Sequence, residues 1–221
     1  MQLNNTTMNP IVSEQIESYC EAHTTRESEL LRDLSRETCA NIARPHMLSG
    51  HLQGRFLSMI SKMIKPQYVL EIGTYTGYSA LCLAEGIRDG GELHTIELDP
   101  KLEEIIVKYF NASEHRGKIH LYIGNAAEII PKLDKTWDLV FIDANKKKCL
   151  QYYEMVLPHV RSGGFVLVDN VLWEGKVTEP AAQNDVFTKT FMEFNDFVQN
   201  DPRVLNMLLP LRDGLMLIEK L

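Results

Sequence analysis

Acidic residues end four of the short apolar runs in this 221-residue chain. The four are Glu71, Glu97, Asp143 and Asp169, which close or follow the runs in "YVLEIG", "LHTIEL", "LVFIDA" and "FVLVDN". A carboxylate at the end of a strand can accept hydrogen bonds from the hydroxyl groups of a ligand, or it can bind a cation. These residues are therefore the first candidates for a binding site.

A turn with two glycines, Gly73 and Gly77, follows Glu71 in "EIGTYTGYSA". Glycine permits positive φ and a close approach of the backbone to a ligand. The spacing is G-x-x-x-G rather than the G-x-G-x-x-G of dinucleotide sites, and no basic residue lies nearby for a pyrophosphate. A nucleoside without phosphates fits better, and Glu97 is placed to accept its ribose hydroxyls. The alternatives are a plain turn and, for Glu97 and Asp99, a helix cap before Pro100.

Asp143 and Asp169 would meet at one edge of a parallel sheet if their strands are adjacent. Two neighbouring carboxylates repel each other unless a cation or a shared proton lies between them. Asn170 adds an amide oxygen, and a set of oxygen ligands suits a hard cation such as Mg²⁺. Because neighbours in a strand point to opposite faces, Asp169 and Asn170 can share an ion only where the chain leaves the strand. The alternative for "DN" is a turn or a helix cap.

Lys146 lies three residues after Asp143 in "DANKKK" and is a candidate general base. A nearby cation and partial burial would lower the pKa of its amine, as a base requires. The alternative, which we favour for Lys147 and Lys148, is a solvated charged face.

A doubly wound, mostly parallel sheet is the fold that would position these residues. After Pro66, apolar runs alternate with helical segments, which indicates a parallel sheet covered on both faces. Two apolar runs flank "RDG" near the end of the chain and predict a hairpin with an antiparallel last strand. Residues 11 to 64 show helical spacing and no convincing strand. We expect one domain over residues 1–221, with a helical extension over 1–65 and the sheet over 66–221.

Composition narrows the class of protein. The formal net charge of -7 disfavours nucleic acid as a partner. The four cysteines are scattered without a CxxC pair, which is typical of reduced thiols. The polar start of the chain is no secretory signal, and no apolar stretch is long enough for a membrane span. We expect a cytoplasmic enzyme or binding protein that does not associate with membranes.

These motifs resemble the cation-dependent O-methyltransferases, the family of catechol O-methyltransferase and caffeoyl-CoA O-methyltransferase. The resemblance rests on "EIGTYTGYSA", "FIDANK", "DNVLWEGKV" and the final "RDG", and covers roughly residues 44 to 221. It implies a seven-stranded Rossmann-like fold of the S-adenosylmethionine methyltransferase type, and a homodimer. It also implies S-adenosylmethionine and a divalent cation, Mg²⁺ with Mn²⁺ or Ca²⁺ as alternatives, acting on an aromatic small molecule.

The resemblance also implies roles for individual residues. The cofactor-binding positions would be Ser49, Glu71, Gly73, Thr74, Ser79, Glu97, Ala126 and Asn145. The metal ligands would be Asp143, Asp169 and Asn170, with Lys146 as the base and Trp173 and Glu174 on the substrate side. Two positions depart from the plant enzymes: Asn145 stands where they carry an aspartate, and Glu174 replaces an asparagine that contacts substrate. A small catechol or related vicinal dihydroxy compound is therefore favoured over a bulky CoA ester.

Three alternatives stay open from the sequence. A nicotinamide-dependent dehydrogenase would use Glu97 for its ribose, but the glycine spacing disfavours it. A non-catalytic nucleoside-binding or scaffold protein would bind the cofactor without metal-dependent turnover. A nucleic-acid methyltransferase is disfavoured by the acidic balance of the chain.

Overall fold

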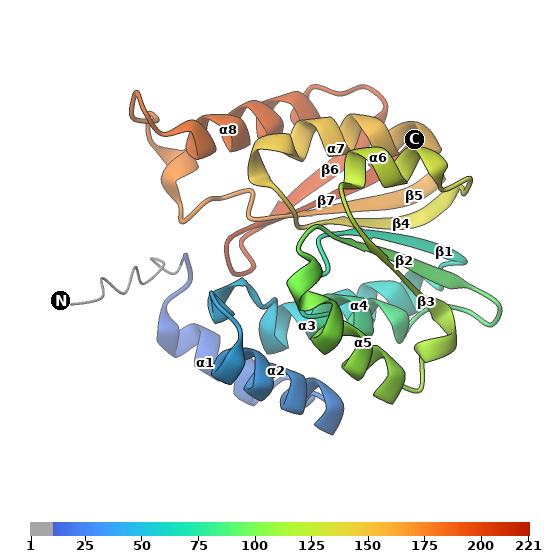
Figure 1. The fold of residues 1–221 in the computed structure, drawn as a ribbon. Helices are drawn as coiled ribbons and strands as arrows, with labels where there is room; N and C mark the ends of the chain where they lie inside the picture. Colours follow the sequence, from blue (N-terminus) through green and yellow to red (C-terminus); the bar gives the residue numbers. More distant parts are fainter. Residues whose placement is uncertain (1–10) are drawn as a thin grey trace.

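The computed structural model describes residues 11–221 and contains one seven-stranded sheet of order β3-β2-β1-β4-β5-β7-β6. Only β7 runs antiparallel to its neighbours, β5 and β6 (Figure 1). The strands are β1 (Tyr68–Ile72), β2 (Glu92–Glu97), β3 (Ile119–Ile123), β4 (Trp137–Ile142), β5 (Val160–Asp169), β6 (Val204–Leu209) and β7 (Leu215–Lys220). The predicted doubly wound sheet with its antiparallel last strand is confirmed.

Helices cover both faces of the sheet (Figure 1). One face carries α1 (Glu14–Ala22), α2 (Glu29–Asn41), α3 (Gly50–Ile64), α4 (Tyr78–Ala84) and α5 (Glu103–Ala112). The other carries α6 (Ala126–Ile129), α7 (Cys149–Val156) and α8 (Val186–Gln199). Short 3-10 turns are η1 (Pro45–Met47), η2 (Pro100–Leu102), η3 (Arg116–Lys118), η4 (Ile130–Lys132), η5 (Lys146–Lys148), η6 (Leu157–His159) and η7 (Lys176–Thr178).

The core lies in two layers, one on each side of the sheet. Successive residues of β4 show this arrangement, because Leu139 packs in the layer of α3 to α5 while Val140 packs in the layer of α7 and α8. Both side chains are fully buried. A strand that is buried on both faces needs apolar residues at every position, which is why the strand sequences are continuous apolar runs.

Side-chain caps set the starts of several helices. Ser13 caps α1 by accepting a hydrogen bond from the Ile16 N–H. Asp99 caps η2, accepting from the Lys101 N–H just before Pro100, so the assignment of Asp99 as a helix cap is confirmed. The described part of the predicted helical extension contains α1 to α3, and residues 1–10 lie outside the described residues.

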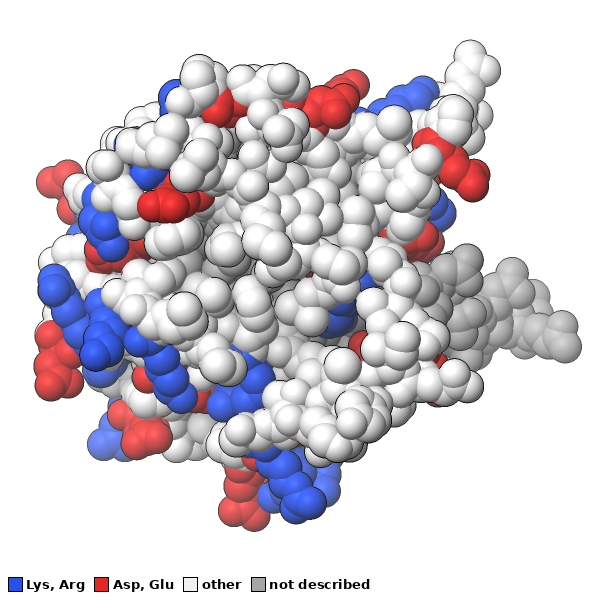
Figure 2. Space-filling view, turned by 180° about the vertical axis from the view of Figure 1, so that it is seen from behind, with Lys and Arg blue, Asp and Glu red and all other residues white. Residues whose placement is uncertain are grey.

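Charged side chains of both signs lie close together around the rim of one face of the molecule, and an uncharged area occupies its centre (Figure 2). Between residues 11 and 221, no helix combines the length and the apolar character that crossing a bilayer requires.

Candidate functional site

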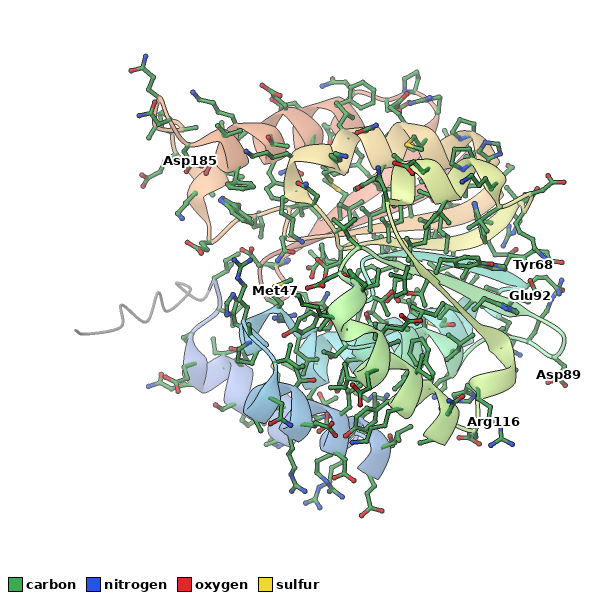
Figure 3. All side chains as sticks on the ribbon, viewed as in Figure 1. Met47, Tyr68, Asp89, Glu92, Arg116 and Asp185 are labelled. Carbon is green, nitrogen blue, oxygen red and sulfur yellow. The ribbon has the colours of Figure 1, made fainter. Side chains whose placement is uncertain are left out.

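The candidate site lies at the carboxyl edge of the sheet, where the strand order reverses between β1 and β4. Ligands of open α/β sheets bind at such a reversal. In the strand register, Ile72 is paired with Ile142 and Ile142 with Val168, so the residues that follow these three emerge at one edge. Figure 3 shows Met47 near this edge, whereas Tyr68 and Glu92, which begin β1 and β2, lie at the opposite one.

The glycine turn after β1 is required by the packing of the chain itself. Gly73 has φ +101°, and a Cβ built on it would lie 2.0 Å from the Asp143 carbonyl oxygen. Gly77 has φ +96°, and its Cβ would lie 2.6 Å from the Phe110 ring. We predicted that the glycines allow a ligand to lie close to the backbone. At Gly73, the close neighbour is instead the backbone of Asp143.

Glu71 is fully buried beneath this turn, and one of its carboxylate oxygens has no hydrogen-bond partner. Its Oε2 accepts a hydrogen bond of 2.5 Å from the Thr95 hydroxyl, whose own oxygen lies 2.5 Å from the Thr74 hydroxyl. Burial raises the pKa of Glu71 to about 8, although the hydrogen bond from the Thr95 hydroxyl favours its charged form. A buried carboxylate oxygen without a donor is a suitable place for an ammonium or hydroxyl group of a ligand.

Glu97 is held at the end of β2 by two backbone donors. Its Oε2 accepts from the Tyr75 N–H at 2.7 Å and its Oε1 from the Asp99 N–H at 2.8 Å. These bonds tie the second strand to the glycine turn, and the remaining lone pairs of the carboxylate can accept hydroxyl donors.

The other predicted cofactor residues lie near helix or turn starts at the carboxyl edge. Ser49 is buried and directly precedes α3, Ala126 is buried and begins α6, and Ser79 is buried in the first turn of α4. Asn145 caps η5 by accepting a hydrogen bond of 3.1 Å from the Lys147 N–H. The structure thus gives Asn145 a local role, and its predicted contact with the cofactor stays a prediction.

Two predicted metal ligands converge on one positively charged atom. The Lys146 Nζ lies 2.5 Å from Asp143 Oδ1 and 2.5 Å from Asn170 Oδ1. Asn170 has φ +67°, so the chain leaves the strand after Asp169, as the shared-ion hypothesis requires. Oxygen atoms from two strand ends therefore already point at a position that a cation occupies.

Asp169, the third predicted ligand, is buried next to this position, with 3% of its surface exposed. Burial and the nearby Asp143 carboxylate raise the pKa of Asp169 to about 6, while Lys146 and Arg212 act in the opposite direction. Two carboxylates and an amide oxygen form a donor set that suits a hard divalent cation. Within residues 11–221, no group of three or more His, Cys, Asp or Glu side chains could hold a metal, so the third protein ligand here would be the Asn170 amide.

The predicted lowering of the Lys146 pKa depends on a nearby cation and stays a prediction. Burial by itself would lower the pKa, but the Asp143 and Asp169 carboxylates outweigh it and raise the pKa of Lys146 above its ordinary value. The physical reason is that the ammonium is itself the counter-ion of the two acids.

The predicted substrate side is built from the loop after β5 and the turn between β6 and β7. Trp173 packs against Phe187 and Phe191, with ring centroids 5.2 and 5.3 Å apart. Asp213 accepts hydrogen bonds from the Asn170 side chain and from the Glu174 N–H. Asp213, which is buried, therefore holds in place the loop that carries Asn170 and Glu174.

Sequence reasoning missed Thr95, Gln53 and Arg212. Thr95 lies opposite Glu71 in the strand register, and its hydroxyl is the donor to that carboxylate. Gln53 and Arg212 bond to each other beside Asp169. Pairing β1 with β2 from the sequence could have placed Thr95 opposite Glu71. Gln53 lies in a helical pattern of mostly apolar residues, and nothing in that pattern indicates a functional role.

Comparison with known proteins identifies what the chain is similar to. The model of a family described as "O-methyltransferase" matches residues 21–221. "Probable caffeoyl-CoA O-methyltransferase 2" of Dictyostelium discoideum is 30% identical over all of this chain and 94% of its own length. "Catechol O-methyltransferase domain-containing protein 1" of Mus musculus is 32% identical over 92% of this chain and 79% of its own length.

Solved structures of similar proteins share the fold. The O-methyltransferase TomG from Streptomyces achromogenes, solved in complex with S-adenosylmethionine, has a TM-score of 0.85 at 24% identity, covering 99% of each chain. The Podospora anserina methyltransferase PaMTH1, solved with S-adenosylhomocysteine, has a TM-score of 0.84 at 27% identity, covering 100% of this chain and 98% of its own.

Proposed function

Because the chain belongs to the O-methyltransferase family, we propose that it transfers a methyl group from S-adenosylmethionine to one hydroxyl of a vicinal dihydroxy aromatic molecule, with a divalent cation at the acceptor side. The chain is an S-adenosylmethionine-dependent methyltransferase related to the caffeoyl-CoA O-methyltransferases. The metal, the acceptor and the residue roles below are the proposal.

One observation carries the metal part of the proposal. Asp143 and Asn170 each direct an oxygen at the Lys146 ammonium, at 2.5 Å from its Nζ, and the buried Asp169 lies beside them. Mg²⁺ binds oxygen ligands and keeps positions for water or substrate, and Mn²⁺ and Ca²⁺ accept similar donors. These three residues would hold the ion.

Support for the cofactor pocket comes from the two acids at the ends of β1 and β2. The Glu71 Oε1 is buried without a donor, which suits the ammonium of a methionine group. Glu97, fixed by two backbone N–H groups, would accept ribose hydroxyls. Ser49, Thr74, Ser79, Ala126 and Asn145 would complete the pocket.

The chemistry assigned to the chain is positioning and proton transfer. A bound divalent cation supplies Lewis acidity, which favours the deprotonated form of a hydroxyl. Lys146, in its neutral amine form, would accept the hydroxyl proton at its Nζ. The oxygen would then attack the methyl carbon while the carbon–sulfur bond of the sulfonium breaks and the neutral thioether leaves. The pocket residues hold the two reactants in line, and orientation of this kind accounts for several kcal/mol of the barrier, on the order of 7 to 11 in favourable systems.

A small aromatic acceptor is favoured over a CoA ester by the substrate-side loop. Glu174 places a carboxylate there, partnered by Lys176, and this carboxylate would repel the phosphate groups of a CoA ester. A caffeoyl-CoA ester remains the second candidate, because the names of several curated relatives specify it. A methyl-transfer screen of catechols, caffeoyl esters and flavonoids with each metal separates the two.

Asp169→Ala is the variant that tests the proposed function. We expect turnover to fall below detection, because the metal position loses a buried carboxylate, while S-adenosylmethionine binding by calorimetry changes little. Wild-type turnover should likewise stop in excess chelator and return with Mg²⁺. Full activity after metal removal would contradict the metal role, and cofactor binding without turnover on any acceptor would favour a non-catalytic nucleoside-binding protein.

We also propose a homodimer and a cytoplasmic location. Support for self-association is the edge strand β6, whose Leu205 and Met207 are 58% and 57% exposed. Support for a reducing compartment is that Cys20 and Cys39 are exposed free thiols, outside any disulfide of the described chain.

A further inference from the structure

Arg212, in the turn between β6 and β7, joins the last hairpin to the helical segment that precedes the sheet. Its backbone has φ +51°, a left-handed conformation that is uncommon for a residue with a side chain. Its Nη1 donates a hydrogen bond of 2.9 Å to Gln53 Oε1 on α3, and its Nη2 lies 3.5 Å from the His46 carbonyl oxygen. The guanidinium is therefore held beside the acceptor side of the site.

The positive charge of Arg212 has no ion-pair partner in the described part of the chain. Both of its hydrogen-bond acceptors, an amide and a backbone carbonyl, are neutral. Within residues 11–221, no carboxylate oxygen of an Asp or Glu lies within 4.0 Å of the Arg212 guanidinium nitrogens, the distance that defines an ion pair. A guanidinium with unused donors in this position suits a planar anion, which it can bind with two parallel hydrogen bonds.

Gln53 supplies a second donor at the same place. Its side chain is completely buried, and its Nε2 has no hydrogen-bond partner. Arginine can only donate, so the Gln53 oxygen must face Arg212 and the amide N–H₂ must point elsewhere. The Gln53 amide lies close enough to favour the charged form of the Asp169 carboxyl, but no hydrogen bond of normal geometry forms between them. A buried amide donor without an acceptor is costly unless a ligand supplies one.

We propose that Arg212 and Gln53 form a carboxylate-binding subsite, which selects dihydroxy aromatic acceptors that carry a carboxylate away from the reacting hydroxyls. This inference rests on the proposed function and names the class of acceptor for the same site. The guanidinium binds the carboxylate, the Gln53 Nε2 donates a further hydrogen bond, and the hydroxyls lie where Asp143, Asp169 and Asn170 would hold the cation.

The test compares acceptors that differ only in this charge. 3,4-Dihydroxybenzoate and 3,4-dihydroxycinnamate are each assayed against their methyl esters, with catechol as the neutral reference. We expect the wild-type protein to favour the acids over the esters in kcat/KM by about 10-fold to 100-fold, the range of one desolvated bidentate contact. The difference should lie mainly in KM, because the contact binds ground state and transition state alike.

Arg212→Gln removes the charge and should abolish the preference for acids, so that the ratio of kcat/KM between each acid and its ester falls toward one. Arg212→Lys keeps the charge without the planar fork and should retain part of the preference. Arg88→Gln is the matched control, since Arg88 is exposed next to Asp89, which Figure 3 places far from Met47. Melting temperature and S-adenosylmethionine binding are measured for each variant.

The outcomes separate this inference from the proposed function. Equal kcat/KM for acids and esters in the wild-type protein would overturn the subsite without any variant. If Arg212→Gln slows acids, esters and catechol alike, Arg212 supports the site as a whole and the subsite is also wrong. If the affinity for S-adenosylmethionine falls instead, Arg212 binds the carboxylate of the cofactor. Turnover of none of these acceptors by the wild-type protein would contradict the proposed function itself.

Discussion

Lys146 is both the proposed base and the internal counter-ion of the acidic residues. Its ammonium contacts Asp143 and Asn170, and the nearby carboxylates raise its pKa. A divalent cation that takes these oxygens would remove the partners that stabilise the charged amine. Metal binding and the availability of Lys146 as a base would then be linked, because the same two oxygens serve both cations.

Lys146→Met should therefore separate these two roles. We expect turnover to fall by about 10² to 10⁴, the usual contribution of a general base. Mg²⁺ should bind at least as tightly as in the wild-type protein, because the competing ammonium is gone. Both are measured at several pH values with one acceptor, and Lys147→Met, at an exposed neighbour, is the control. An unchanged rate with an unchanged pH profile would remove Lys146 from the mechanism.

Individual site residues could be predicted from the sequence where a charged side chain directly follows an apolar strand. Asp143 and Asp169 were predicted because an acid after an apolar strand is unusual, and parallel strands bring such ends together. Gln53 and Arg212 were not, because each is ordinary in its local context and they meet only through the tertiary fold. The raised pKa of Lys146 was also missed, since it depends on which oxygens the ammonium contacts.

At the scale of elements, the turn between β1 and α4 fixes the distance between the two halves of the site. Gly73 allows this turn to lie against the backbone of Asp143, at the reversal point of the sheet. The proposed cofactor residues of the turn and Asp143, a proposed metal ligand at the end of the neighbouring strand β4, are thus in direct backbone contact.

Gly73→Ala should destabilise the protein by about 3 kcal/mol or more, because it combines left-handed strain with a clash against backbone. Gly90→Ala is a matched control, since Gly90 also has positive φ but a Cβ there would meet nothing within 4 Å. We expect Gly90→Ala to cost only about 1 kcal/mol. Urea unfolding compares the two, and equal losses would show that contact with Asp143 is unimportant.

Glu85 anchors α3 to the end of α4 through a cluster of donors. It accepts hydrogen bonds from Arg55, Ser58 and Lys62, the shortest of them 2.5 Å from Arg55. Burial alone would raise the pKa of Glu85, but these donors outweigh it and lower the pKa to about 2. The helix that carries Gln53 is therefore fixed to the end of α4 by a charged contact.

Glu85→Gln should lower the free energy of unfolding at pH 7 by about 1 to 3 kcal/mol, since it leaves Arg55 without its carboxylate. The folded-state pKa lies below the unfolded value, so the contribution of Glu85 is complete above pH 4.5 and is lost as the pH falls toward 2. The gap between wild type and variant should shrink over that window in urea unfolding. Glu29→Gln, in an exposed pair, should show neither effect. A gap that stays constant down to pH 3 would contradict this account.

At the scale of the whole molecule, the sequence predicted the architecture better than the details of the site. Alternating apolar strands and helices after Pro66 left few possible topologies, because parallel strands need crossover helices and both faces must be covered. The acceptor side depends on contacts between α3 and the last hairpin. Local patterns do not record such contacts, so that part required coordinates.

Self-association through β6 is the prediction for the whole molecule. We expect a dimer in light scattering, because an edge strand with exposed apolar side chains favours pairing with a second copy. Leu205→Lys combined with Met207→Lys should give a folded monomer. Tyr19→Lys, at an exposed position on α1, should leave the dimer intact. A monomeric wild-type protein at micromolar concentration, or a dimeric double variant, would exclude this surface.

The contact between Gln53 and Arg212 joins residues that are 159 positions apart. During synthesis, the glycine turn and the strand ends that line the cofactor pocket leave the ribosome well before the final hairpin does. A nascent chain could therefore form its nucleoside-binding half while its acceptor half still lacks Arg212 and Asp213. Under this proposal, selectivity for the acceptor would be the last property that the growing polypeptide acquires.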